Sequence, residues 1–168
     1  HLILDETGFL NVCTTALETT RNTDSLVTLG IQPTRPDTGY GYIQHEEPHD
    51  TERAEVRPVK TFTEKPDLET AQAFLASGDF CWNSGIFVFK AADYLAELER
   101  LQPETLAACD HAVSKATNDL DFIRLDEASF AKADSISIDY AVMERTAHAA
   151  VIPAEMGWND VGGWSALW

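Results

Sequence analysis

Short apolar runs alternate along this chain with segments whose apolar residues recur at helical spacing, and this alternation narrows the choice of folds more than any other feature. Helical spacing marks residues 5–20, 67–77, 94–101, 106–113 and 138–142, and short apolar runs mark residues 26–31, 40–44, 56–62, 85–90 and 149–152. Strands that alternate with helices pack as layers around a shared sheet. The sequence therefore predicts an α/β fold, with a mixed sheet flanked by helices, in one domain over residues 1–168.

Local signals define several ends of these elements. Asp67 suits a helix N-cap, and Gly78 suits a helix end. Residues 85–90 are apolar on both faces, which predicts a buried strand. We expect the acidic stretch 45–55 to be a solvent-exposed connection, and Trp164 to begin a further helix.

The charge and cysteine content of the chain restrict its partners and its location. A net charge of −16 argues against nucleic acid, because phosphate backbones would be repelled, although a local cation or a bound metal still allows a small phosphorylated substrate. No apolar run approaches the roughly 20 residues needed to cross a bilayer, so no membrane partner is expected. The three cysteines, Cys13, Cys81 and Cys109, lack metal-ligand spacing, and buried thiols are favoured over a catalytic cysteine. Free thiols of this kind favour a cytoplasmic location for the protein.

The run Thr38-Gly39-Tyr40-Gly41 follows a proline-rich segment. Two glycines separated by one residue let a backbone approach a ligand closely. Thr38 supplies a hydroxyl, and Tyr40 supplies an apolar wall with a polar tip. These properties predict a substrate-binding loop, but a proline-rich turn that leads into an edge strand would explain the same residues.

Three polar residues farther along the chain have the chemistry of a sugar-phosphate site. Glu64 and Lys65 precede a proline, where both side chains can turn toward a cleft. A carboxylate accepts hydrogen bonds from sugar hydroxyls, and an ammonium binds phosphate as a point charge. Asn83 can donate and accept at once, which suits a sugar diol. The alternatives are a solvated charge pair for Glu64 and Lys65 and a turn residue for Asn83.

Two aspartates and two histidines complete the candidates. Asp160 lies in a glycine-flanked loop, where it can reach Mg²⁺ or can cap a helix. Asp139 is interpreted first as a cap or first-turn acid of a helix and second as a substrate contact. His45 and His49 lie in the acidic stretch, which favours a solvated loop over a weak metal site. The sequence contains no Ser-His-Asp nucleophile elbow and no GxxxxGK[ST] phosphate loop.

Five motifs occur in one order: Thr-Gly-Tyr-Gly-Tyr-Ile (38–43), Phe-Thr-Glu-Lys-Pro (62–66), Trp-Asn-Ser-Gly-Ile-Phe (82–87), Ser-Ile-Asp-Tyr-Ala-Val-Met-Glu (137–144) and Gly-Trp-Asn-Asp-Val-Gly-Gly-Trp (157–164). Together they resemble the bacterial mannose-1-phosphate guanylyltransferases, and the resemblance covers essentially the whole chain. It implies a Rossmann-like nucleotidyltransferase fold and transfer of GMP from GTP to mannose 1-phosphate, with Mg²⁺ as cofactor.

The resemblance also implies a role for individual residues. The sugar would be contacted by the backbone around Gly41, by the Glu64 carboxylate and by the Asn83 amide. Lys65 would bind the sugar phosphate, and Asp160 would be the second of two metal carboxylates. Substrate contacts are therefore expected along the run from Thr38 to Gly41 and at Glu64, Lys65, Asn83 and Asp139.

The family's nucleotide-binding loop and first metal aspartate would lie upstream of His1. Residues 1–168 would then be the sugar-phosphate-binding, C-terminal portion of the nucleotidyltransferase domain, truncated at both ends and inactive alone. A pyrophosphorylase for another sugar 1-phosphate and a non-catalytic sugar-phosphate-binding domain are the alternatives. Self-association into a homo-oligomer is a further expectation.

Overall fold

The computed structural model describes residues 1–46 and 56–163. Packing divides the chain into two compact units. The first is made of His1–Lys90 and Ala147–Trp168, and the second is made of Ala91–Thr146.

The first unit is built on one mixed sheet with the strand order β1-β4-β2-β3-β7, which closes on itself. The strands are β1 (Leu26–Ile31), β2 (Tyr42–His45), β3 (Arg57–Thr63), β4 (Phe80–Val88) and β7 (Ala149–Ala154). Strands β1 and β7 are parallel, and the other pairs are antiparallel. The parallel pair is almost wholly buried, as its continuous apolar sequence requires. The predicted mixed sheet is confirmed.

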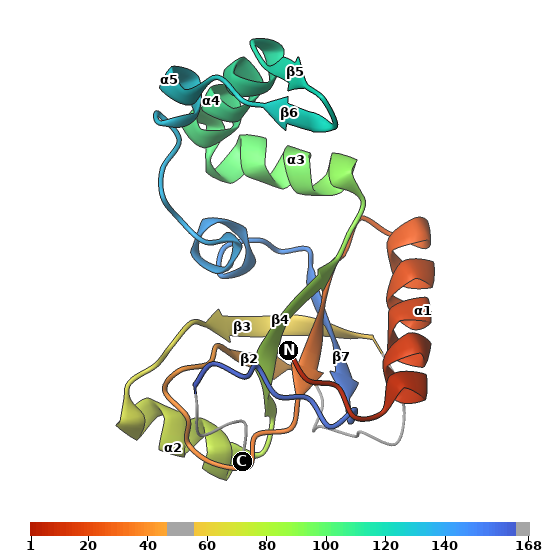
Figure 1. Ribbon diagram of the computed structural model, residues 1–168. Helices are drawn as coiled ribbons and strands as arrows, with labels where there is room; N and C mark the ends of the chain where they lie inside the picture. The colour runs from red at the N-terminus through yellow and green to blue at the C-terminus, as the bar shows by residue number, and fades with distance from the viewer. Residues whose placement is uncertain (47–55, 164–168) are drawn as a thin grey trace. The chain divides into compact units, whose positions relative to one another are not determined.

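Two helices flank this sheet, α1 (Glu6–Asn22) and α2 (Leu68–Ser77), and Figure 1 shows both beside the strands. Helix α1 buries Val12 and Ala16 against residues of β1 and β7. Helix α2 begins and ends as the sequence predicts. The Asp67 carboxylate accepts a hydrogen bond from the Thr70 N–H, and Gly78 takes the left-handed conformation, with φ 78°.

The second unit contains helices α3 (Ala91–Leu101), α4 (Pro103–Ser114) and α5 (Glu127–Phe130), a hairpin of β5 (Thr117–Asp119) and β6 (Phe122–Arg124), and the π-helix η1 (Asp139–Met143). The helix expected at residues 138–142 is this wider turn. Neither the hairpin nor α5 was predicted. The hairpin turns through Leu120 at φ 55° instead of through a glycine. Helix α5 has only 4 residues, which is too short to show apolar residues at helical spacing. In the described part of the chain, no helix combines the length and apolar character needed to span a bilayer.

Two expectations about burial were wrong. The strand expected at residues 85–90 begins at Phe80, and its buried part is Phe80–Ser84. In that part, residues 80–82 pair with β2, and Trp82 and Asn83 also pair with β1, as do Phe87 and Val88 farther along the strand. His45, assigned to a solvent-exposed stretch, ends β2 and is fully buried. The remainder of that stretch, 47–55, and the helix expected at Trp164 lie outside the described residues.

The cysteines differ in burial. Cys81 is buried within β4, and burial raises the pKa of its thiol to about 12. Cys13 and Cys109 are half-buried. A thiol with so high a pKa is almost wholly protonated at neutral pH, which favours the packing interpretation of Cys81 over a catalytic one.

Candidate functional site

Two polar candidates, Glu64 and Asn83, meet at Gly41 just before β2 begins, because β2 lies between β3 and β4 in the sheet. The Asn83 N–H donates to the Gly41 carbonyl at 2.8 Å. A Cβ added to Gly41 would collide with the Glu64 carboxylate and would stand 3.3 Å from the Asn83 Cβ. The Glu64 and Asn83 side chains therefore lie on the same face of the sheet, on either side of Gly41.

The Asn83 side chain has a fixed orientation. Its Oδ1 accepts hydrogen bonds from the Thr28 hydroxyl and from the Gly85 N–H, each at 3.1 Å. Thr28 is fully buried, and Asn83 is 9% exposed. An amide held in this way is preorganised for recognition, because little rotational freedom remains to be lost when a ligand binds.

Lys65 joins this group through an unusual backbone conformation. Successive side chains of a strand point to opposite faces, so Glu64 and Lys65 would diverge if β3 continued through them. The strand ends at Thr63, and Lys65 has a φ of 47°, in the left-handed region. Its Nζ lies 3.4 Å from Glu64 Oε1, and the Glu64 side chain is 10% exposed while the Lys65 side chain is 59% exposed. A nearly buried acceptor thus stands beside an accessible cation.

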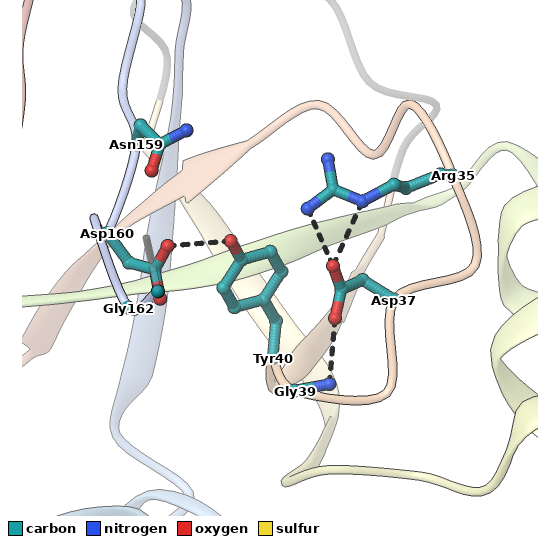
Figure 2. A pocket seen from close by; sticks show the side chains of 8 residues that line it. Arg35, Asp37, Gly39, Tyr40, Asn159, Asp160 and Gly162 are labelled. Carbon is teal, nitrogen blue, oxygen red and sulfur yellow. Dashed lines mark hydrogen bonds and ion pairs between the residues drawn. The ribbon is translucent and has the colours of Figure 1, made fainter. Parts of the chain in front are cut away.

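Next to this group lies a cavity of about 580 Å³, a typical size for a small-molecule site. The connection between β1 and β2 and the loop after β7 form it, as Figure 2 shows. Its lining residues are Arg35, Asp37, Gly39, Tyr40, Asn159, Asp160, Gly162 and Gly163. Tyr40 precedes Gly41 directly, and Trp82, which contacts the Tyr40 ring, precedes Asn83. The cavity and the Gly41–Glu64–Asn83 group are therefore neighbours along two segments of chain.

Arg35 supplies positive charge at the cavity wall. Its Nε and Nη2 donate to Asp37 Oδ2 at 3.0 and 2.6 Å, and Asp37 Oδ1 accepts from the Gly39 N–H at 2.9 Å. The hydrogen bond to Asp37 raises the pKa of Arg35. The guanidinium lies 5.2 Å from the ring centre of Trp82 and 5.9 Å from that of Tyr40. The guanidinium lies against aromatic rings, and the Arg35 side chain as a whole is 58% exposed.

Tyr40 connects the two segments that form the cavity. Its hydroxyl donates to Asp160 Oδ1 at 2.8 Å. Burial and, next, the hydrogen bond to Asp160 raise the pKa of Tyr40, so the hydroxyl is protonated at neutral pH and acts as the donor. The ring makes edge contacts with Trp82 and Trp158, with ring centres 5.0 Å and 5.5 Å apart respectively.

The Asp160 carboxylate is a suitable ligand for a magnesium ion, but one carboxylate does not make a complete site. It lines a polar cavity, and carboxylate oxygen is the ligand that Mg²⁺ prefers. Within residues 1–46 and 56–163, however, no three His, Cys, Asp or Glu side chains cluster as metal ligands. Mg²⁺ commonly takes one or two carboxylates together with substrate phosphates and water. Asp160 therefore fits Mg²⁺ as one protein ligand among several.

Two further predicted site residues, Thr38 and Asp139, are not among those that line the cavity. Thr38 is exposed and is not among the residues that line the cavity. Asp139 belongs to the second unit, where it is the first residue of η1. Ile138 is the N-cap of that turn, so Asp139 is its first-turn acid. Thr38 stands between Asp37 and Gly39, which both line the cavity.

Sequence reasoning missed four contributors to the cavity region. Asp37 could have been recognised, because Asp-x-Gly is a common turn in which the carboxylate accepts the N–H two residues later. Asn159 makes the same kind of turn with the Val161 N–H and could have been recognised in the same way. Arg35 and the Trp82 ring carry no comparable local signal, because the contact between them joins segments that are distant in sequence.

Comparison with known proteins identifies the family. The model of the family described as "Nucleotidyl transferase" matches residues 3–168. A mannose-1-phosphate guanylyltransferase of Escherichia coli K12 is 49% identical over the whole chain, and the ManC protein of Salmonella typhimurium, named as the same enzyme, is 50% identical. The xanthan biosynthesis protein XanB of Xanthomonas campestris strain B100 is 49% identical over 99% of the chain. The chain spans about a third of the length of these relatives, between 34% and 35%.

Two solved structures have a similar fold. One, from Helicobacter pylori, is described as a mannose-6-phosphate isomerase. It is 33% identical, with a TM-score of 0.83 over 95% of this chain and 60% of that one. The other, from Thermus thermophilus, is described as a mannose-1-phosphate geranyltransferase. It is 30% identical, with a TM-score of 0.82 over 99% of this chain and 45% of that one. On the match over residues 3–168, the chain belongs to the nucleotidyl transferase family, and the resemblance seen in its motifs is confirmed.

Proposed function

We propose that this chain is the sugar-phosphate-binding portion of an enzyme that transfers GMP from GTP to mannose 1-phosphate. The convergence of Gly41, Glu64 and Asn83, with the Lys65 ammonium beside them, is the observation that carries the proposal. A carboxylate and an amide on one face suit the hydroxyls of a sugar ring, and the ammonium suits its phosphate. The names of the relatives favour mannose as the sugar and guanylyl as the transferred group.

The reaction requires little covalent chemistry from the protein. An oxygen of the sugar phosphate attacks the α-phosphorus of GTP, a new P–O bond forms, the bond to the β-phosphate breaks, and pyrophosphate leaves. The nucleophile is already an anion, so no general base is needed. In this proposal Glu64 and Asn83 orient the sugar, and Lys65 holds its phosphate. Mg²⁺ bound at Asp160 would supply charge neutralisation.

Two local cations make the binding of phosphorylated substrates compatible with a net charge of −16. The side chains of Lys65 and Arg35 are both more than half exposed, and each is ion-paired with one carboxylate, that of Glu64 and that of Asp37. An ammonium has three N–H donors and a guanidinium has five, so each has more donors than one carboxylate takes up. Exposed cations in and beside a cleft attract phosphates at short range, while the charge of the distant surface is screened within about 8 Å at physiological salt. An acidic protein can therefore bind anionic substrates here.

The test is pyrophosphate release by the full-length protein, with GTP and mannose 1-phosphate as substrates. We expect turnover with this pair and a large loss in an Asp160→Asn variant. Glucose 1-phosphate and the other nucleoside triphosphates serve as competing substrates, and the isolated 168-residue chain, which we expect to be inactive, is assayed in parallel. Faster turnover with a different pair would reassign the substrates. Sugar-phosphate binding without turnover by any pair would show a non-catalytic domain.

A further inference from the structure

The two oxygens of the Asp160 carboxylate have different surroundings. Oδ1 accepts the 2.8 Å hydrogen bond from Tyr40. Oδ2 lies over Gly162, only 2.5 Å from the position that a Cβ of residue 162 would occupy. Any side chain at position 162 would therefore push against the carboxylate. The tyrosine thus holds one oxygen, and the glycine leaves room for the other.

The backbone around Asp160 is also constrained. Val161 has a φ of 55°, an uncommon conformation for a β-branched residue. Its N–H donates to Asn159 Oδ1 at 2.8 Å, and this bond closes a tight turn around Asp160. Strain of this kind persists only when surrounding contacts enforce it, and it is concentrated at functional sites.

Tyr40 is suited to hold the carboxylate because it is itself fixed. The ring lies between Trp82 and Trp158, with edge contacts to both, and the Arg35 guanidinium lies over it. Figure 2 shows the hydroxyl directed across the cavity at the Asp160 side chain. A hydroxyl on a ring held in this way has few other positions to occupy.

We infer that Tyr40 is a positioning residue, whose hydroxyl sets the direction in which Asp160 presents its carboxylate to a divalent cation. This inference rests on the proposed function, since it takes Asp160 as the magnesium carboxylate. It replaces the expectation that Tyr40 serves as a wall for the sugar. A cation that dehydrates reluctantly gains most from a ligand whose orientation is set in advance.

The test is Tyr40→Phe in the full-length protein, with Mn²⁺ as the spectroscopic probe. Phenylalanine keeps the ring contacts and removes only the hydroxyl. We expect Mn²⁺ affinity, measured by electron paramagnetic resonance without nucleotide, to fall roughly tenfold or more, in the range found when partners of metal ligands are removed. The Mg²⁺ concentration for half-maximal turnover should rise in parallel, and the KM for mannose 1-phosphate should stay within twofold.

Tyr42→Phe is the matched control. It removes a tyrosine hydroxyl two residues away, one that donates to the Asp37 carbonyl at 3.0 Å, and it should leave Mn²⁺ affinity unchanged. Gly162→Ala perturbs the carboxylate from its other side and should also weaken Mn²⁺ binding, with Tyr40 intact. This second variant tests, with Tyr40 unchanged, whether cation binding depends on the position of the Asp160 carboxylate.

The outcomes separate this inference from the proposed function. Equal Mn²⁺ affinity in wild type and Tyr40→Phe would overturn the positioning role, as would a wild type with no saturable Mn²⁺ binding. A raised mannose 1-phosphate KM with unchanged cation dependence would overturn it in favour of a substrate wall. If the wild type fails to turn over GTP with mannose 1-phosphate, the proposed function fails, and the Mn²⁺ titration still decides the role of Tyr40.

Discussion

Replacing Gly41 by alanine should disable sugar binding without unfolding the protein. The added Cβ would overlap the Glu64 Oε2 atom and would press lightly, at 3.3 Å, on the Asn83 Cβ. Oε2 is the far end of a flexible side chain, so Glu64 can swing away at little cost. Gly41 is not among the residues with positive φ, so alanine adds no backbone strain. The damage should therefore be confined to the position of the Glu64 carboxylate.

The expected size of the effect follows from the lost contact. Hydrogen bonds to a charged group contribute about 1.5–3 kcal/mol, which corresponds to a fall of about 10- to 150-fold in kcat/KM for mannose 1-phosphate. The assay is steady-state pyrophosphate release by the full-length protein, with each substrate varied in turn. The GTP parameters at saturating sugar phosphate should change much less.

A matched glycine and a double mutant give the prediction its controls. Gly78→Ala places a Cβ in open space but at φ 78°, so it should cost about 1–2 kcal/mol of stability and leave kcat/KM unchanged. If Gly41→Ala acts through Glu64, adding it to Glu64→Ala should cause little further loss. Full additivity in the double mutant, or a Gly41→Ala enzyme within twofold of wild type, would refute the reasoning.

Three further predictions follow from individual contacts. Lys65→Ala should raise the KM for mannose 1-phosphate, because it removes a charge-assisted phosphate contact worth about 1.5–3 kcal/mol, and a selective rise in the GTP KM would contradict this. The hydrogen bond from Thr70 lowers the pKa of Asp67, so its stabilising effect is present above the unfolded pKa of about 3.9 and is lost as pH falls through the lower folded value. Urea midpoints measured against pH should therefore fall more steeply below about pH 4 in wild type than in Asp67→Asn, and parallel curves would argue against the cap. The Cys81 thiol, with a pKa of about 12, should resist alkylation at pH 8 in the folded protein and react after unfolding, as mass spectrometry can show; rapid labelling of the native protein would contradict its burial.

Helix ends and buried strands were the features most readable from sequence. The α2 helix begins after Asp67 and ends at Gly78 as expected, because a cap and a left-handed glycine act within a few residues. The strand at residues 26–31 was equally clear from its continuous apolar run. The start of β4 was missed, because this buried segment pairs with β2 at residues 80–82 and with β1 at Trp82 and Asn83, and a local pattern does not reveal such pairing.

The sequence by itself determined the family and the chemical types present at the site: a carboxylate, an ammonium, an amide and glycines that permit close approach. The tertiary structure decided which of them meet. Glu64 and Asn83 face each other across Gly41 because β2 pairs with β3 on one side and β4 on the other, in a register that one residue of slippage would invert. Tyr40 reaches Asp160 across 120 residues of chain because the β1–β2 connection and the loop after β7 meet at one cavity. Such contacts follow from burial and pairing summed over the whole sheet, so they become visible only once the sheet is formed.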